Sequence, residues 1–312
     1  MDTDAVVFEK PGLIGIRRVT LRQPTAGDVV VETRSSGIST GTEKLLFEGV
    51  MPYFPGLAYP LVPGYETLAQ VVEAGPDSGR QTGETVFVPG ATCYTDAAGL
   101  FGANAARLVV PGSRCVPVSP ALGADAPLLA LAATAHNAVT RARQTPGLVI
   151  GHGVLGRLIA RIIVAQGHPA PCVWETNPAR RAGAEGYRVI DPAQDEAPPY
   201  AAVIDASGDA AVLDGAIARL ARQGELVLAG FYRGRVGFDF VPAFLREISL
   251  SIAAEFRPAD MQAVQALHAA GQLSLAGLIT HRARPDQAAD AFRTAFTDPD
   301  CLKMVIDWRM AA

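Results

Sequence analysis

A glycine-rich turn near the middle of the chain constrains the fold most strongly. The segment Gly151-His152-Gly153-Val154-Leu155-Gly156 follows an apolar stretch, residues 148–150, and precedes a helical pattern over residues 157–166. Glycines at this spacing permit a tight strand-to-helix turn, a close approach of backbone to a pyrophosphate, and close packing of helix on strand. The helix N-terminus then presents its N–H groups and dipole to phosphates. The motif, including Val154 and Leu155, therefore predicts a dinucleotide site.

An acidic residue follows at the distance expected of such a site. The apolar run Cys172-Val173-Trp174 ends at Glu175, about 20 residues past the glycines, where a carboxylate binds the adenosine ribose hydroxyls. This spacing favours NAD over NADP. The alternative is that Glu175 is a solvated residue at a strand end. Arg180 and Arg181 would suit a 2′-phosphate, but their position equally suits an exposed helix face.

The region around this motif alternates short apolar segments with longer helical patterns, which is typical of a parallel sheet covered by helices. The segments that we predict as its strands are 148–151, 172–175, 202–206 and 225–229. We expect a doubly wound sheet. Ser207, Gly208 and Gly230 follow two of these strands, at the sheet edge where a cofactor would lie. We predict that they line the nicotinamide side, with ordinary turn chemistry as the alternative.

The rest of the chain predicts a second domain, since 312 residues exceed a typical single core. Strands separated by Pro and Gly turns are predicted at residues 5–8, 14–19, 29–35, 68–73 and 85–88. Near the C-terminus we predict helices at 260–270 and 285–296 and strands at 278–281 and 303–307. The expected divisions are a mainly β domain over 1–120, the dinucleotide-binding domain over 121–253, and a segment over 254–312 that returns to the first domain.

Composition excludes several classes of protein. The net charge of -4 and the lack of a basic stripe argue against a nucleic-acid partner. The most apolar region, residues 127–139, is too short to cross a bilayer, and residues 1–10 do not resemble a secretory signal. The four cysteines include no C-x-x-C pair, which suits reduced thiols. We therefore expect a cytoplasmic enzyme without a transmembrane segment. The sequence is compatible with a homodimer.

Nearly the whole chain resembles the medium-chain dehydrogenase/reductase superfamily. The segment 35–39 resembles the stretch that carries that family's first catalytic zinc ligand, and 62–66 resembles its Gly-His-Glu segment. The resemblance implies a GroES-like catalytic domain followed by a Rossmann domain, with Thr134 packed near the nicotinamide. Ser39 stands in place of the expected cysteine and Tyr65 in place of the expected histidine. Because neither supplies the ligands that zinc prefers, we expect a zinc-independent member with no metal site.

A narrower resemblance concerns three further segments, 51–60, 174–181 and 278–282, taken together with the glycine-rich turn. They are similar to the bacteriochlorophyllide dehydrogenases of bacteriochlorophyll biosynthesis. This resemblance implies a tetrapyrrole substrate whose 3-(1-hydroxyethyl) group is oxidised to 3-acetyl, with NAD taking the hydride. The alternatives are a zinc-independent quinone or enone reductase of the same superfamily, and a non-catalytic tetrapyrrole carrier.

Without zinc, a side chain or water must accept the alcohol proton. Tyr65, beside Glu66, is one candidate, provided that a cation such as oxidised nicotinamide or Lys44 lowers the pKa of its phenol. The alternative is that Tyr65 fills the vacated zinc cavity and forms a hydrogen bond with Ser39. Ser39 is predicted to orient the alcohol. His152 is a second candidate proton carrier, with a structural loop histidine as its alternative.

An aromatic segment before Tyr65 is the candidate substrate-binding loop. It places four aromatic side chains within thirteen residues: Phe47, Tyr53, Phe54 and Tyr59. Prolines between them restrict the backbone, so such a loop would offer ring faces to a macrocycle at low entropic cost. We expect a wide, aromatic-lined pocket between the domains. The alternative is a hydrophobic lid packed on its own domain.

Overall fold

The computed structural model describes residues 1–52 and 54–310, and the chain divides into two compact units. The first comprises Met1–Ala130 with Leu278–Ala312, and the second is Leu131–Gly277. The expected division at residue 253 thus differs from the one observed. Helix α6 (Pro258–Ala269) belongs to the second unit because it packs on α2 (Leu129–Arg141), where the Asp260 carboxylate lies 2.7 Å from Nδ1 of His136.

The second unit is built on one parallel sheet. Its strands are β10 (Leu148–Ile150), β11 (Cys172–Trp174), β12 (Arg188–Ile190), β13 (Tyr200–Asp205), β14 (Leu220–Leu228) and β15 (Ser249–Ile252). They lie in the order β12-β11-β10-β13-β14-β15, and every neighbouring pair is parallel. This strand order is that of the doubly wound dinucleotide-binding fold. The predicted sheet is confirmed, although β12 and β15 were not predicted.

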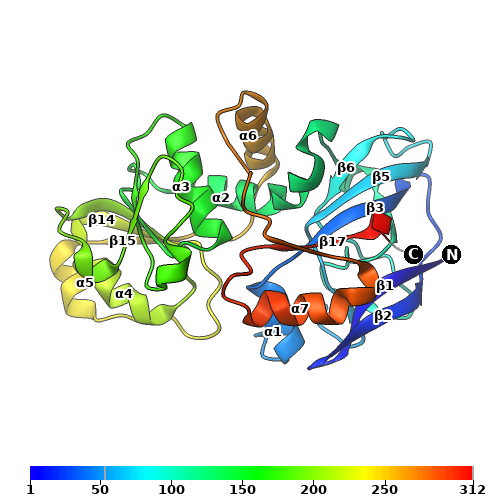
Figure 1. Ribbon diagram of the computed structural model, residues 1–312, viewed down its shortest axis with the longest axis horizontal. Coiled ribbons are helices and arrows are strands. Elements are labelled where there is room, and N and C mark those ends of the chain that lie inside the picture. The colour runs from blue at the N-terminus through cyan, green and yellow to red at the C-terminus, as the bar shows by residue number, and fades with distance from the viewer. Residues whose placement is uncertain (53, 311–312) are drawn as a thin grey trace. The chain divides into compact units, whose positions relative to one another are not determined.

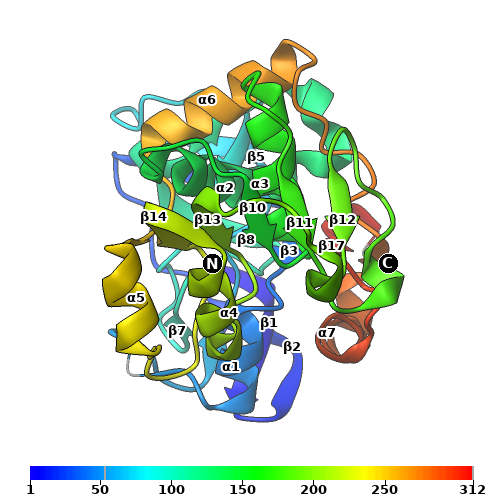
Figure 2. The ribbon, with the colours of Figure 1, turned by 90° about the vertical axis from the view of Figure 1, so that its left-hand side faces the viewer.

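Helices cover both faces of this sheet. On one face α3 (Val154–Ala165) packs against β10, and on the other α4 (Leu213–Ala218) and α5 (Phe240–Arg246) pack against β14 (Figures 1 and 2). The side chains of the central strands β10 and β11 are all buried and apolar, as expected for a sheet covered by helices.

The first unit contains two sheets. Their strands are β1 (Asp2–Lys10), β2 (Leu13–Thr20), β3 (Asp28–Ile38), β4 (Leu61–Val62), β5 (Thr67–Ala74), β6 (Thr85–Val88), β7 (Ala98–Gly99), β8 (Arg107–Pro111), β9 (Val116–Pro117), β16 (His281–Ala283) and β17 (Met304–Asp307). The smaller sheet has the order β2-β1-β4-β7. The larger has the order β16-β17-β3-β5-β6-β9, with β8 also paired to β3. The five strands predicted in this region are confirmed.

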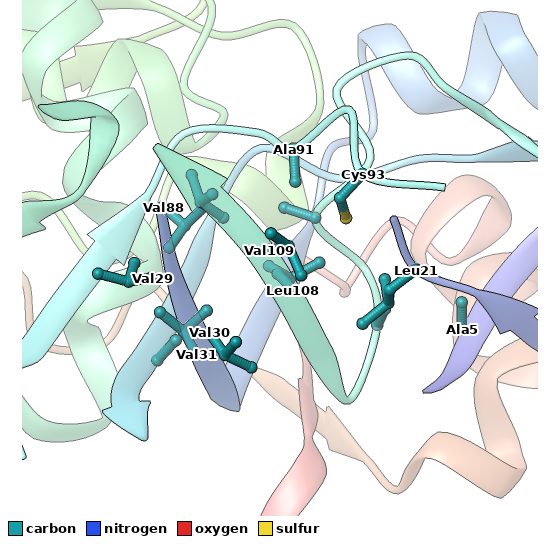
Figure 3. Close-up of a cluster of buried hydrophobic side chains, with 14 of the residues drawn as sticks. Ala5, Leu21, Val29, Val30, Val31, Val88, Ala91, Cys93, Leu108 and Val109 are labelled. Atoms are coloured by element: carbon teal, nitrogen blue, oxygen red, sulfur yellow. The ribbon is translucent and has the colours of Figure 1, made fainter. Parts of the chain in front are cut away.

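Valine-rich strands form the core of this unit. Val30 of β3 lies opposite Val109 of β8, and Val31 lies opposite Leu108. Figure 3 shows these side chains gathered with that of Cys93, which is also fully buried. Branched side chains pack well on a pleated surface, so such residues favour these strands over helices. All four cysteines are buried, and no disulfide joins them within the described residues.

From Leu278 onward the chain lies in the first unit, whereas the predicted returning segment began at residue 254. Strand β17 pairs antiparallel with β3, and α7 (Ala288–Thr297) packs against β17. The strand predicted at 278–281 is wrong in position. Pairing with β17 begins only where His281 lies opposite Met304, so β16 starts at His281.

Short helical segments complete the two units. Helix α1 (Thr42–Glu48) follows β3, where no helix was predicted. The 3₁₀ helices are Gly112–Arg114, Pro120–Leu128, Pro178–Arg180, Pro192–Gln194, Ala210–Val212, Pro285–Gln287 and Trp308–Met310. Across residues 1–52 and 54–310, none of the helices has the length and apolar character needed to cross a bilayer.

Candidate functional site

The glycine-rich turn joins β10 to α3 with the geometry that a dinucleotide site requires. Gly151 has a positive φ of 94°, which favours glycine. A Cβ atom on Gly156 would overlap the carbonyl oxygen of Gly151, so this glycine is needed for the close approach of helix and turn. At Gly153, in contrast, a Cβ would meet nothing within 4 Å, and no side chain caps the helix there. The turn therefore leaves open space at the N-terminus of α3.

Glu175 lies directly beside this turn. One of its carboxylate oxygens accepts a hydrogen bond from the His152 backbone N–H at 3.0 Å, and the other accepts one from the Asn177 N–H at 2.8 Å. Charged acceptors strengthen such bonds, so the side chain is held at the end of β11. Arg181 donates to the Glu175 carbonyl at 2.8 Å and pairs with Asp191 at 2.5 Å.

His152 is buried, with no exposed surface. Its Nδ1 donates to the Arg180 carbonyl at 2.6 Å, and its Nε2 accepts from the Tyr187 hydroxyl at 2.9 Å. Burial lowers the pKa of the imidazole to about 4, so the ring is neutral at pH 7. Since both ring nitrogens are occupied inside the protein, the geometry favours the structural loop histidine. We therefore do not propose His152 as a proton carrier.

Arg157, on the first turn of α3, reinforces the same loop. Its guanidinium donates to four backbone carbonyls, those of His152, Arg180, Ala182 and Gly183, at 2.8–3.1 Å. A rigid fork of donors suits such a cluster of carbonyls. The loop that follows Glu175 is thereby tied to the glycine-rich turn. This role was not predicted from the sequence, since nothing in the local pattern shows which carbonyls will converge.

The ends of β13 and β14 also meet near the glycine-rich turn. The Asp205 carboxylate accepts hydrogen bonds from the Ser207 N–H and hydroxyl, at 3.0 and 2.6 Å, and from the Tyr232 hydroxyl. Gly208 has a φ of 68°, and a Cβ on Gly230 would overlap the Gly208 backbone nitrogen. These residues therefore form a close-packed edge in which small residues are required. Thr134 lies on α2 and is partly exposed.

In the first unit, Ser39 and Tyr65 come together as a pair. The Tyr65 hydroxyl donates to Ser39 Oγ at 2.6 Å, the hydrogen bond that the cavity-filling interpretation predicted. Burial and the nearby Glu66 carboxyl raise the pKa of the Tyr65 phenol. A phenol of raised pKa is a poor proton acceptor at pH 7. The Tyr65 ring also packs against Phe101 in an edge-on contact, with ring centroids 5.1 Å apart.

Of the two cations predicted near this pair, oxidised nicotinamide and Lys44, the lysine is engaged with other residues. Lys44 donates to the Phe296 carbonyl at 3.0 Å and lies 3.8 Å from Glu48, so its charge is used elsewhere. Instead Lys303, which is 2% exposed, forms an ion pair with the buried Glu66. No local pattern indicates this pair, because Lys303 lies far along the chain, directly before the C-terminal strand β17.

A second buried carboxyl lies close by. Glu43, the second residue of α1, has no exposed surface, and its carboxylate accepts the Ser39 N–H at 3.3 Å. Burial and the neighbouring Glu66 raise the pKa of Glu43 to about 8. Sequence analysis missed Glu43 because α1 itself was not predicted. In the described residues, no group of three or more His, Cys, Asp and Glu side chains is arranged to hold a metal ion.

The candidate substrate loop is packed largely on its own unit. Phe47 contacts Phe8 with ring centroids 5.7 Å apart, and Phe54 contacts Phe101 at 5.9 Å. The Tyr59 hydroxyl donates to the Leu46 carbonyl. All three loop aromatics are half-buried, and Tyr53 lies outside the described residues. These contacts agree with the lid interpretation, while leaving part of each ring exposed.

Comparison with known proteins agrees with this architecture. Residues 25–120 match the family model described as the alcohol dehydrogenase GroES-like domain. A short chain alcohol dehydrogenase from Escherichia coli CFT073, solved in complex with NADH, superposes with a TM-score of 0.84 at 21% identity, over 98% of this chain and 99% of its own. The fold of this chain is therefore that of the alcohol dehydrogenases, with a GroES-like domain and a dinucleotide-binding domain.

Two curated relatives are much more similar. The 2-desacetyl-2-hydroxyethyl bacteriochlorophyllide A dehydrogenase of Cereibacter sphaeroides is 54% identical over 318 residues, and that of Rhodobacter capsulatus is 52% identical over 313 residues. Each match covers 100% of both chains. The chain belongs to the family of these two dehydrogenases, within the medium-chain dehydrogenase/reductase superfamily. The predicted family is confirmed.

Proposed function

We propose that this chain catalyses the NAD-dependent oxidation of the 1-hydroxyethyl side chain of a bacteriochlorophyllide-type tetrapyrrole to an acetyl group. The observation that carries the proposal is the full-length identity of 54% with a dehydrogenase named for that hydroxyethyl substrate. Both relatives are named dehydrogenases, which favours alcohol oxidation over the reductase and carrier alternatives.

The residues of the second unit fit a nicotinamide dinucleotide. The open space at Gly153 and the uncapped start of α3 suit a pyrophosphate. Glu175, held by two backbone N–H groups, suits the adenosine ribose and favours NAD over NADP. We include Val154, Leu155, Ser207, Gly230 and Thr134 among the proposed contacts. When bound, the nicotinamide would accept the hydride.

The first unit would orient the alcohol through hydroxyl groups. Ser39 Oγ accepts one hydrogen bond from Tyr65, so a second acceptor site and its own O–H remain for holding the substrate hydroxyl and passing on its proton. Hydroxyls of Ser and Tyr are poor zinc ligands compared with Cys and His, so we propose that this site works without zinc. The exposed parts of Phe47, Phe54 and Tyr59 remain the proposed contacts of the macrocycle.

We further propose that two copies of the chain associate through the second unit. Within the described residues β15 pairs only with β14, which leaves the backbone groups of its other edge unpaired. Beside it, α5 exposes Phe240 and Leu245 at 70% and 67%, and β15 exposes Ile252 at 61%. An edge strand and an apolar patch together suit a symmetric partner. Ile252→Arg should convert a dimer to a monomer in light-scattering measurements; an unchanged mass would contradict this interface.

The enzymatic proposal is tested with purified protein, NAD and a pigment that carries the hydroxyethyl group. We expect NADH to form in step with the acetyl pigment, measured by absorbance and chromatography. A pigment that already carries the acetyl group is the matched control and should give no NADH. No turnover with either NAD or NADP would refute the proposal.

A further inference from the structure

The hydroxyl pair of Ser39 and Tyr65 lies next to a group of buried charges. Two carboxyls, Glu43 and Glu66, and one ammonium, Lys303, are each at most 2% exposed. A buried charge is costly unless it is paired. With one cation for two carboxyls, the group is electrically balanced only when one carboxyl holds a proton.

Lys303 neutralises Glu66. The two side chains form an ion pair that is buried on both sides. A Cβ atom on Gly37 of β3 would overlap the Glu66 carboxylate and lie 3.0 Å from Cε of Lys303. The glycine thus allows this pair to lie against the strand. Burial raises the pKa of Glu66, and the Lys303 ammonium opposes this by favouring the ionised carboxylate.

Glu43 is left with weaker partners. Its Oε2 accepts only the Ser39 N–H, at 3.3 Å, and its buried Oε1 has no hydrogen-bond partner within the described residues. The charged and titratable groups that face it come from two other segments: Tyr65 and Glu66 before β5, and Lys303 before β17. Lys44, on its own helix, contacts Phe296 and Glu48 instead.

We propose that Glu43 is the proton-holding residue of this site: it acts through Ser39 to take up the proton that the alcohol loses. This inference rests on the proposed oxidation. With NAD as the proposed hydride acceptor, the alcohol C–H and O–H bonds would break as the C=O bond forms. The alcohol proton would pass to Ser39 Oγ while the O–H bond of Ser39 breaks and a new O–H bond forms on the carboxylate of Glu43, which already accepts the N–H of the same serine. The proton then leaves to solvent, and the carboxylate is restored.

The chemistry of the site favours Glu43 over Tyr65 in this role. Burial and Glu66 raise the pKa of Tyr65, whereas the pKa of Glu43 is about 8, close to the pH at which an enzyme works. A proton acceptor is most effective when its pKa lies near the working pH. Only the ionised form of Glu43 can accept a proton, so oxidation should accelerate as the pH rises toward that pKa.

The first test compares the pH dependence of kcat/KM for pigment oxidation in the wild type, Glu43→Gln and Glu48→Gln. Glu48 lies on the exposed side of the same helix and is the matched control. We expect the wild type and Glu48→Gln to gain about tenfold per pH unit below the pKa, and Glu43→Gln to lose this rise. A Glu43→Gln profile that keeps the rise would overturn the proposal.

The second test does not depend on turnover, so it separates this inference from the proposed oxidation. A carboxyl whose pKa is raised on folding favours the native state below its unfolded pKa, and that advantage is lost as the pH rises through the folded value. The unfolding midpoint of the wild type should therefore fall relative to that of Glu43→Gln between about pH 5 and pH 8. If the unfolding midpoints of the two proteins change in parallel over this pH range, Glu43 holds no proton in the native state.

The third measurement needs no variant, in case Glu43→Gln fails to fold. Infrared spectra of wild-type protein labelled with ¹³C at its glutamate carboxyls should show a protonated carboxyl band that persists at pH 7 and disappears near pH 8. Loss of every protonated band below pH 6 would overturn the proposal. Persistence of the band in a protein that oxidises no pigment would refute the proposed function and leave the proton site in place.

Discussion

Substitution by alanine should have different effects at two glycines of the same turn: it should lower the stability at Gly156 and the NAD affinity at Gly153. In Gly156→Ala the new methyl group overlaps the carbonyl oxygen of Gly151, a backbone atom that cannot move without shifting the turn. Overpacking of this kind costs about 1–3 kcal/mol. At about 2–4 °C per kcal/mol for a unit of this size, the melting temperature should fall by roughly 2–12 °C. In Gly153→Ala the methyl group meets nothing within 4 Å, and φ is -73°, which alanine adopts readily.

The Gly153→Ala protein should therefore melt within about 2 °C of the wild type. Its methyl group would occupy the space proposed for the pyrophosphate, so NAD affinity should fall at least about tenfold, or 1.4 kcal/mol. Calorimetric titration measures the affinity, and differential scanning calorimetry measures the melting. The reasoning is refuted if Gly153→Ala binds NAD as tightly as the wild type, or if Gly156→Ala melts at the wild-type temperature.

Three further predictions concern the cofactor, the metal and the substrate loop. Glu175→Ala should weaken NAD binding by about tenfold or more, because each charge-assisted hydrogen bond is worth about 1.5–3 kcal/mol; equal use of NADP by the wild type would argue against the proposed role. The purified enzyme should keep its activity in chelator, and one tightly held zinc per chain would end the zinc-free proposal. Phe54→Ala should raise KM for the pigment while NAD affinity stays unchanged; unaltered pigment kinetics in a folded variant would remove the loop from the site.

The fold of the second unit could be predicted because the sequence patterns that indicate it lie close together in the chain. The apolar strand, the three glycines and the following helix lie within one short segment, and the strand order follows from repeated crossovers. The missed strands lack that signal. Strand β12 has one exposed and two half-buried residues, whereas β10 and β11 are fully buried, and β15 alternates serine with exposed Leu250 and Ile252. Edge strands are buried on fewer sides, so their sequences carry a weaker apolar pattern.

In the first unit, local sequence patterns predict the strands but not the contacts between residues that are far apart in the chain. The hydrogen bond between Tyr65 and Ser39 was one of the two alternatives predicted for this pair, and the structure contains it. Lys44 was one of the two cations predicted near Tyr65, with oxidised nicotinamide as the other. The structure places Lys303 there instead, since β17 pairs with β3 and brings its preceding residue against Glu66. The ion pair depends on the pairing of two strands that lie far apart in the sequence, so the residue spacing within either segment cannot predict it.

These contacts also bear on how the proposed zinc-free site would work. A zinc ion would supply positive charge directly at the alcohol oxygen, and a pair of neutral hydroxyls supplies none. What the chain offers instead is a place for the proton: a carboxyl behind Ser39 that is buried, incompletely hydrogen-bonded and not matched by the single ammonium of Lys303. Such an imbalance costs folding free energy, and packing alone would favour an apolar residue at position 43. The presence of Glu43 is therefore better explained by proton transfer than by stability.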